Sequence, residues 1–381
     1  MVHLHHIMKK ILLIFLFSFL LTSHLTYAQD ATLVTDTEVF EKAKVLKVTD
    51  QKLITIPGID TPTKTQTLQV QVLSGANTDK ILTFKNDYIQ LSQGDIFYIR
   101  HQTNHIDNSE YWSVSDPYRL DTLLYLAIFF VALIFIFGGI QGVRGLASLV
   151  GSFILIFYVL IPGIYSGYNA VLVSIGVASL IIIVGSYITH GFNRTTSAAV
   201  LGMIFTVFIT GLIAYYIVFS AKLSGYSSDE NMFLDMNTRG KIDMVGLLFG
   251  GIMIGLLGVL YDIAIGQAIA IEELFRAGKH LTRKEVYLRA IRIGREHIGA
   301  LVNTLAIAYV GASLPLLLLM QSSTAGLLFI INNEIFATEI IRILIGSIGL
   351  ILAVPITNLL ATYMLHDKVT DTHSSHTHHH H

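Results

Sequence analysis

The chain has 381 residues, of which 53% are hydrophobic and only 13% are charged. A soluble domain carries about a quarter charged residues, so this composition, with a mean hydropathy of +0.63, indicates a protein embedded in a membrane. The formal net charge of −1 gives no support for nucleic-acid binding, and the absence of cysteine excludes disulfides, thiolate metal sites and cysteine nucleophiles.

The first 28 residues have the layout of a secretory signal. Residues 8–28 begin with two lysines, continue through an apolar core from Ile11 to Leu21, and end in a small-x-small cleavage pattern. We therefore predict a signal peptide over residues 1–28, with Met8 as the natural start. An uncleaved first helix is the alternative, but the apolar run is short for a membrane span.

Residues 29–118 are the polar part of the chain and predict a small extracytoplasmic β-rich domain. Residues 67–73 and 96–100 alternate apolar and polar side chains, which is typical of half-buried strands. Turn residues separate the predicted strands: Pro57-Gly58, Ser74-Gly75 and Gly94-Asp95. Near the end of the domain, four side chains are of types that bind metals, although we favour a solvated loop: His101, His105, Asp107 and Glu110.

From Leu120 onward, the sequence contains seven apolar segments that are long enough to cross a membrane. Each approaches the ~20 apolar residues that a helix needs to span the hydrocarbon. The predicted fold class is an all-α polytopic membrane protein, with seven transmembrane helices over residues 119–365 preceded by the β-rich domain. The segments are 120–138, 146–162, 169–189, 196–220, 244–271, 299–320 and 341–364.

The distribution of basic residues predicts the orientation. With a cleaved signal, the β-rich domain lies outside and the first span runs inward. Arg144, Arg194 and the basic stretch 276–295 then face the cytoplasm, and the acidic loop 221–242 lies outside, as the positive-inside rule requires. We predict a multi-pass protein of a bacterial plasma membrane, with its N-terminal domain outside. The His-rich segment 366–381, a native tail or a tag, lies in the cytoplasm.

The longest inner loop predicts an amphipathic helix of its own, over residues 283–297. Thr282 and Glu285 fit a capping box at its start. The basic face of this helix fits a docking site for a cytoplasmic protein, whereas attraction to anionic lipid is the simpler explanation. The residues of this inner docking helix are Arg289, Arg292 and Arg295.

One carboxylate, Asp262, interrupts the apolar run of the fifth span, where a charge is costly to bury. If Glu272 and Glu273 mark the inner boundary, Asp262 lies about 15 Å from it, near the midplane. If the outer boundary is instead at Asp243, Asp262 sits near the inner interface. The basic loop that follows favours the first of these two registers.

The surroundings of Asp262 predict a coupling site inside the helix bundle. Glycines spaced four apart let another helix approach closely, so we expect the acid-bearing face to pack against protein. An intramembrane carboxylate in that position indicates a proton relay or a cation ligand, and a structural hydrogen bond is the alternative. The packing glycines are Gly246, Gly250, Gly251, Gly255 and Gly266; the candidate partners are Asn303, Thr304, Thr357 and Asn358; the secondary candidates are Gln267, Glu272, Glu273 and Arg276.

Enzyme chemistry finds no support in the motifs. The second histidine of a His-Glu-x-x-His motif is missing after Arg295-Glu296-His297. Tyr261-Asp262 resembles half of an intramembrane aspartyl protease pair, but no Gly-x-Gly-Asp supplies the second aspartate. We predict that the protein is not an enzyme, with no catalytic residue, metal site or cofactor.

Short landmarks follow one another in order over most of residues 118–365. They are FGGIQGVR (137–144), LIPG (160–163), LSGY (223–226), YDIAI (261–265), EEL (272–274), GREH (294–297), NTL (303–305) and AYVGASLP (308–315). Together they resemble the YibE/F-like family of bacterial multi-pass membrane proteins. The resemblance implies a membrane protein and adds no activity.

Residues 261–305 are more faintly similar to the proton-carrying segment of RND-type exporters. In both, an Asp-bearing helix that runs inward is followed by Glu and Arg, a Glu-x-x-x-Arg-like helix and another span. By this resemblance, Asp262 takes the place of the proton-relay aspartate. The chain departs from that pattern in its span count and in lacking a large exterior domain and a second repeat.

We therefore expect a proton- or cation-coupled secondary transporter or exporter, with Asp262 as the coupling carboxylate. The alternative is a non-transporting assembly or signalling component, whose outer β-domain and inner basic helix bind partners. The expected partners are the lipid bilayer, a proton or cation, and a cytoplasmic or extracytoplasmic protein, without nucleic acid. An oligomer is compatible with either role.

Overall fold

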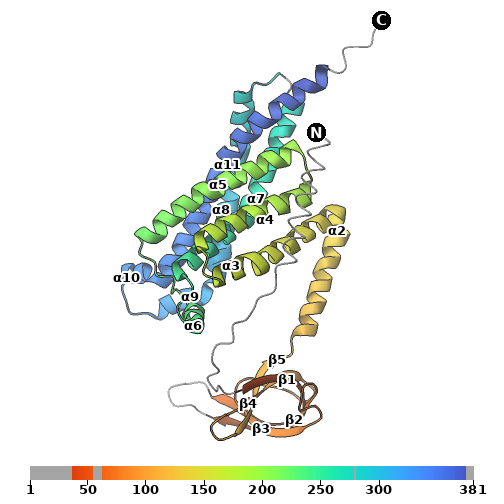
Figure 1. Ribbon diagram of the computed structural model, residues 1–381, viewed down its shortest axis with the longest axis vertical. Coiled ribbons are helices and arrows are strands. Elements are labelled where there is room, and N and C mark those ends of the chain that lie inside the picture. Colours follow the sequence, from red (N-terminus) through yellow and green to blue (C-terminus); the bar gives the residue numbers. More distant parts are fainter. Residues whose placement is uncertain (1–36, 55–61, 279, 375–381) are drawn as a thin grey trace. The chain divides into compact units, whose positions relative to one another are not determined.

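The computed structural model describes residues 37–54, 62–278 and 280–374 (Figure 1). The chain divides after Ile134 into two compact units, and each is described by itself. The predicted signal segment, its start at Met8 and the last seven residues of the His-rich end lie outside the described residues.

The first unit contains a five-stranded antiparallel sheet, as the alternating pattern predicts. Its strands are β1 (Thr37–Ile54), β2 (Thr63–Val72), β3 (Ile81–Asn86), β4 (Ile96–Thr103) and β5 (Glu110–Pro117), in the spatial order β3-β2-β1-β4-β5. The long strand β1 pairs with both β2 and β4, and its register with β2 shifts twice between Val45 and Asp50. Such bulges bend a strand, so the sheet curls around one apolar core (Figure 1).

Two predicted turns of this sheet depend on glycine. Gly75 and Gly94 have φ angles of 93° and 96°, which other residues adopt only with strain. A Cβ atom at Gly75 would also overlap the carboxylate of Glu41. That carboxylate is buried and accepts hydrogen bonds from the backbone and side-chain nitrogens of Asn77, at 3.1 and 3.0 Å.

The side chains weighed as metal ligands do not form a metal site. The ring of His101 stacks on Trp112 with 3.9 Å between centroids, and its Nε2 lies 3.4 Å from a carboxylate oxygen of Glu110. In the part of the chain that the structure describes, no group of three or more such residues is placed to hold a metal ion.

The rest of the described chain is helical. Its elements are α2 (Leu120–Leu155), η1 (Ile156–Leu160), α3 (Ile161–Tyr165), α4 (Ala170–His190), α5 (Arg194–Ser220), α6 (Asp229–Thr238), α7 (Met244–Ala277), α8 (Arg283–Ala312), α9 (Leu314–Ser322), α10 (Leu327–Asn332) and α11 (Glu334–Ser374). Among the described residues, five helical runs are long and apolar enough to cross a membrane, or six if α8 and α9, bent by 64°, form one broken span. Their length and composition indicate a membrane-embedded protein.

The count of seven spans is not confirmed, because two of the predicted spans form one helical run. Residues 120–138 and 146–162 both lie within Leu120–Tyr165, which is 46 residues long. Within α2, the backbone leaves helical geometry at Gly139, with φ 52° and ψ −143°, and two helices meet there across a kink. A glycine tolerates this positive φ, so the chain changes direction after residue 138, where the first predicted span ends.

The amphipathic helix over residues 283–297 is not a separate element, since α8 continues without a break to Ala312. Its predicted capping box is confirmed. The backbone N–H of Thr282 donates to the carboxylate of Glu285 at 2.8 Å, and the backbone N–H of Glu285 donates to the hydroxyl of Thr282 at 3.3 Å. Small side chains at Ala290 and Gly294 are buried. They hold the first half of α8 against the bundle.

Helices α5 and α7 run antiparallel in the centre of the second unit. At one end, Thr195 of α5 bonds Glu272 of α7. At the other end, Thr210 and Leu256 both lie against Gly349 of α11. A Cβ atom at Gly349 would be 3.1 Å from a side-chain carbon of Thr210 and 2.9 Å from one of Leu256. We call the first end of the bundle the Glu272 end.

Candidate functional site in the helical bundle

Asp262 lies on an uncovered face of α7. Seven residues of this helix follow one another at intervals of three and four, so they share one face, and all are exposed. The prediction that the acid-bearing face packs into the bundle is therefore wrong for the single chain. The uncovered face consists of Gly251, Gly255, Gly258, Asp262, Gly266, Ile269 and Glu273.

The close packing of α7 uses glycines on another side of the helix. A Cβ atom at Gly246 would lie 2.7 Å from that of Ala170, and one at Gly250 would lie 2.5 Å from the hydroxyl of Ser174. Both neighbours belong to α4. The spacing of small residues thus predicts a close helix contact correctly, but the contact turns Asp262 away from the bundle.

The other predicted packing glycines lie on the uncovered face. A Cβ atom at Gly255 would overlap the hydroxyl of Tyr309 from α8, whereas one at Gly251 or Gly266 would meet nothing within 4 Å. Gly255 therefore contacts protein, and Gly251 and Gly266 do not.

The four candidate partners do not reach Asp262. Thr304 donates to a carbonyl of its own helix at 2.9 Å, and Asn303 is exposed. Thr357 and Asn358 are fully buried, and their side-chain polar atoms have no partner in the part of the chain that the structure describes. Asp262 itself forms no hydrogen bond or ion pair with any described residue.

Gln267 has the buried position that was expected of Asp262. Its side chain is 1% exposed, and its Oε1 has no hydrogen-bond partner among the described residues. It lies against Gly294 of α8, whose Cβ position is 3.2 Å from Oε1. Val354 of α11 contacts the same glycine. Three helices therefore meet around this one amide.

Two further polar residues of α11 face this junction. Asn358 and Thr362 lie between Val354, which meets α8, and His366, whose ring is 5.6 Å from that of Phe275 in α7. Both are buried, and their polar atoms have no hydrogen-bond partner over residues 37–54, 62–278 and 280–374. We call Gln267, Thr357, Asn358 and Thr362 the buried polar row.

Sequence reasoning missed Thr362 and ranked Gln267 second. The signal for Thr362 was available, because it follows Asn358 by four residues on an apolar helix and so shares its face.

Charged residues on α8 indicate where the apolar surface ends. Arg292 and Arg295 flank Gly294 and are exposed, at the level where Gly294 meets Gln267. Exposed arginines are most stable at or beyond the membrane interface, so we expect the hydrocarbon to end near this level. Asp262, five residues along α7, then lies about 7.5 Å inside it. This geometry favours the register in which Asp262 is near the interface.

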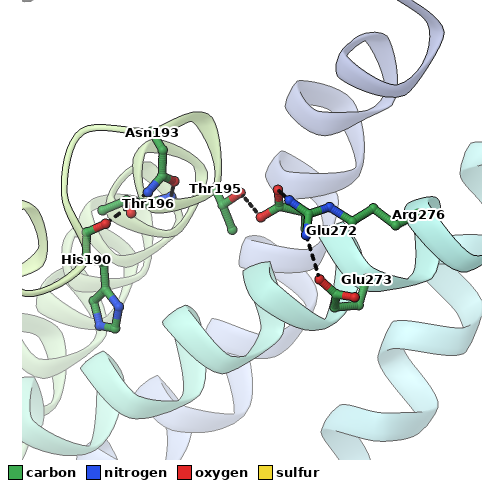
Figure 2. A network of polar contacts seen from close by, with 7 residues as sticks. All are labelled: His190, Asn193, Thr195, Thr196, Glu272, Glu273 and Arg276. Atoms are coloured by element: carbon green, nitrogen blue, oxygen red, sulfur yellow. Dashed lines mark hydrogen bonds and ion pairs between the residues drawn. The ribbon is translucent and has the colours of Figure 1, made fainter. Parts of the chain in front are cut away.

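The carboxylate of Glu272 ties α7 to the start of α5 (Figure 2). The hydroxyl of Thr195 donates to one of its oxygens, and Arg276 donates to the other at 2.7 Å. Arg276 also bonds Glu273 at 3.1 Å. Glu272 is 16% exposed, against 62% for Glu273 and 59% for Arg276. This arrangement fits the structural role that the sequence favours for the two glutamates.

Asn193 prepares the α5 side of this contact by capping the helix (Figure 2). Its side-chain oxygen accepts from the backbone nitrogen of Thr196 at 2.7 Å, and its nitrogen donates to the carbonyl of His190 at 3.0 Å. The cap fixes the turn between α4 and α5, and with it the position of Thr195.

Comparison with known proteins returns one family. The family model described as YibE/F-like protein matches residues 126–367, which is more than half of the chain. The chain belongs to the YibE/F-like family. The match runs from within α2 into α11 and confirms the resemblance of the landmarks. For this YibE/F-like chain, a search of curated proteins and a search of solved structures found no match.

The YibE/F-like chain also exposes a basic face on the first half of α8. Arg289, Arg292 and Arg295 are all exposed, on the side away from the buried residues Ala290 and Gly294. None of the three arginines forms an ion pair with another described residue. Their charge is available to a partner outside the chain.

Proposed function

We propose that the chain is a proton- or cation-coupled secondary transporter of the plasma membrane. The buried polar row is the observation that supports this function, since it places unpaired donors and acceptors inside an apolar bundle. Each such group costs about 1–3 kcal/mol when it has no partner. Carbonyl and hydroxyl oxygens are the ligands that a hard cation prefers, and they also bind water.

Asp262 is the carboxylate that we assign to coupling. It is the single charged residue of α7 between Asp243 and Glu272, and its uncovered face gives access from outside the bundle. In this proposal, Asp262 loads a proton or cation near the interface. The buried polar row, beginning at Gln267, then provides a polar path inside the bundle from near Asp262 toward the Glu272 end.

The orientation belongs to the same proposal. The Glu272 end, which carries the exposed arginines of α8, faces the cytoplasm, as the positive-inside rule favours. The β-rich unit then lies outside the membrane.

Proton flux in liposomes tests the coupling role. Purified protein is reconstituted with a trapped pH-sensitive dye, and an imposed pH gradient is applied with sodium or potassium outside. We expect Asp262→Asn to abolish the cation-dependent change of internal pH. Glu273→Gln is the matched control, because it removes a carboxylate of the same face beyond the apolar run, and it should leave the flux unchanged. A folded Asp262→Asn variant with normal flux, or wild-type protein that no gradient drives, would contradict the proposal.

A second candidate function, assembly with an acidic partner, is favoured by the exposed arginines of α8. A variant with Gln at positions 289, 292 and 295 separates the two roles. Unchanged proton flux with loss of binding to vesicles of anionic lipid would assign this face to the membrane surface. Unchanged flux and unchanged vesicle binding would leave a protein partner as its ligand.

A further inference from the structure

Arg144 is a charged residue within the longest apolar helical run of the chain. Between Asp121 and Asp229 the sequence contains no carboxylate, so neither α4 nor α5 supplies an acid to neutralise it. Arg144 is exposed and forms no hydrogen bond or ion pair with the residues that the structure describes. An unpaired guanidinium among apolar helices is costly where hydrocarbon surrounds it, so an acid from another helix would stabilise it.

The face of α2 that carries Arg144 is the face that packs against α4. The side chain of Gln141 donates to the carbonyl of Thr189 at 3.0 Å. The hydroxyl of Ser148 lies 2.8 Å from the Cβ position of Gly185. Arg144 follows Gln141 by three residues and precedes Ser148 by four, so all three share one face of α2.

The same point of α4 is where α7 arrives. The hydroxyl of Tyr261 donates to the carbonyl of Gly185 at 3.2 Å, and its ring carbon is 3.9 Å from the Cβ position there. Gly185 thus brings Ser148 of α2 and Tyr261 of α7 to one place. Asp262 is the residue after Tyr261, and Arg144 lies one turn before Ser148. Both therefore lie on the side of the Gly185 contact that is nearer the Glu272 end.

The two glutamates of α7 at this end already have a base. Glu272 and Glu273 both pair with Arg276, at 2.7 and 3.1 Å. Asp262 has no such partner among the described residues. There is also room for α2 to approach, because Cβ atoms at Gly258 and Gly266, one turn on either side of Asp262, would meet nothing within 4 Å.

We propose that Arg144 and Asp262 form an ion pair that closes the second half of α2 over the uncovered face of α7. Pairing removes two unpaired charges from the apolar surface at once. This inference deepens the proposed function, because it gives the coupling carboxylate the counter-charge that a bound proton or cation would displace.

Cross-linking tests the approach of the two residues directly, because the chain contains no cysteine of its own. Arg144→Cys combined with Asp262→Cys is treated in native membranes with a short bifunctional thiol reagent, and peptides are identified by mass spectrometry. We expect a cross-link within one chain, at a rate roughly tenfold above that of Arg144→Cys combined with Gly251→Cys. Gly251 lies on the same uncovered face but 11 residues, or about 16 Å, away. Equal rates, no cross-link, or a cross-link between two chains would overturn the proposal.

Charge reversal tests the pairing without using transport. Arg144→Glu and Asp262→Arg are each expected to lower the thermal unfolding midpoint, and the swapped double variant should recover at least part of that loss. Losses that simply add in the double variant would show that the two charges do not interact. Since neither experiment measures flux, the ion pair and the transport function can fail independently.

Discussion

Gln267 is the residue at which burial and function conflict. Its Oε1 has no partner within the protein, and three helices enclose its side chain. An acceptor in this state lowers the free energy of unfolding by about 1–3 kcal/mol relative to a satisfied one. An apolar residue of similar shape would avoid this cost, so packing alone does not account for a glutamine.

Replacing Gln267 by Leu separates the two roles. We expect Gln267→Leu to raise the free energy of unfolding by about 1 kcal/mol, because the unpaired amide is removed while the volume is nearly kept. Proton flux should be lost. Thermal unfolding in detergent and the liposome assay measure the two effects.

Gln141→Leu is the control for Gln267→Leu, because Gln141 is exposed and already bonds a carbonyl at 3.0 Å. It should not raise stability, and its flux should remain. A less stable Gln267→Leu would mean that Gln267 makes a structural hydrogen bond in the folded protein, and the buried polar row would lose its first member.

The sequence marks both polar residues of α7 but does not tell which one faces the bundle. Five residues rotate a helix by about 500°, so Asp262 and Gln267 point about 140° apart. Small-xxx-small patterns occur in two registers, at Gly246 and Gly250 and again at Gly251 and Gly255. Only the first register meets α4. The choice between them depends on tertiary packing, which a single sequence does not contain.

At the scale of the elements, α5 and α11 approach closely at a glycine. A Cβ atom at Gly202 would lie 2.5 Å from the hydroxyl oxygen of Thr357 and 2.9 Å from its Cα. The second distance involves backbone, so a rotamer change at Thr357 cannot relieve it. Thr357 of the buried polar row is therefore buried because Gly202 lets α5 approach α11 closely.

Gly202→Leu is expected to separate α5 from α11 and to lower the free energy of unfolding by about 3 kcal/mol or more, as overpacking does. Gly251→Leu is the matched control, because a Cβ atom there meets nothing within 4 Å. Resistance to trypsin and the thermal unfolding midpoint compare the two variants. Equal losses in both would mean that Gly251 is covered in the native protein.

Helix starts and strands were predicted well, because their signals are local. The capping box at Thr282 and the strands near residues 67–73 and 96–100 all appear in the structure. The break between the first two predicted spans appears as a kink at Gly139, but the boundary predicted around residue 298 is wrong, because α8 continues through it. Whether a charged stretch ends a helix depends on what packs beside it, and buried Ala290 and Gly294 keep α8 helical.

For the whole molecule, we infer the position of the membrane from the length of α7 and from the exposed arginines of α8. Helix α7 has 34 residues, or about 51 Å of helix, whereas the hydrocarbon core is about 30 Å thick. The contact of Gly294 with Gln267 aligns the exposed arginines of α8 with the last third of α7. The end of α7 beyond Gln267 therefore extends out of the hydrocarbon on the Glu272 end.

Single cysteines on the exposed face of α8 test this placement and the orientation together. In inside-out vesicles, we expect Arg292→Cys and Arg295→Cys to react fast with a membrane-impermeant thiol reagent, because they lie in the cytoplasmic interface. Ile307→Cys should react slowly, since it is exposed at 61% but lies within the hydrocarbon. In right-side-out cells, Tyr88→Cys of the β-rich unit, exposed at 69%, should react and the two arginine positions should not.

The reversed labelling pattern in inside-out vesicles and right-side-out cells would invert the orientation. Fast reaction at all three α8 positions in inside-out vesicles would place α8 outside the bilayer. Labelling after solubilisation in denaturing detergent is the control, since every cysteine should then react equally. Fast reaction at Arg295→Cys with slow reaction at Arg292→Cys is also excluded by the proposed geometry. Arg292 lies three residues, or about 4.5 Å, further from the hydrocarbon along α8, so protection by lipid must reach Arg295 first.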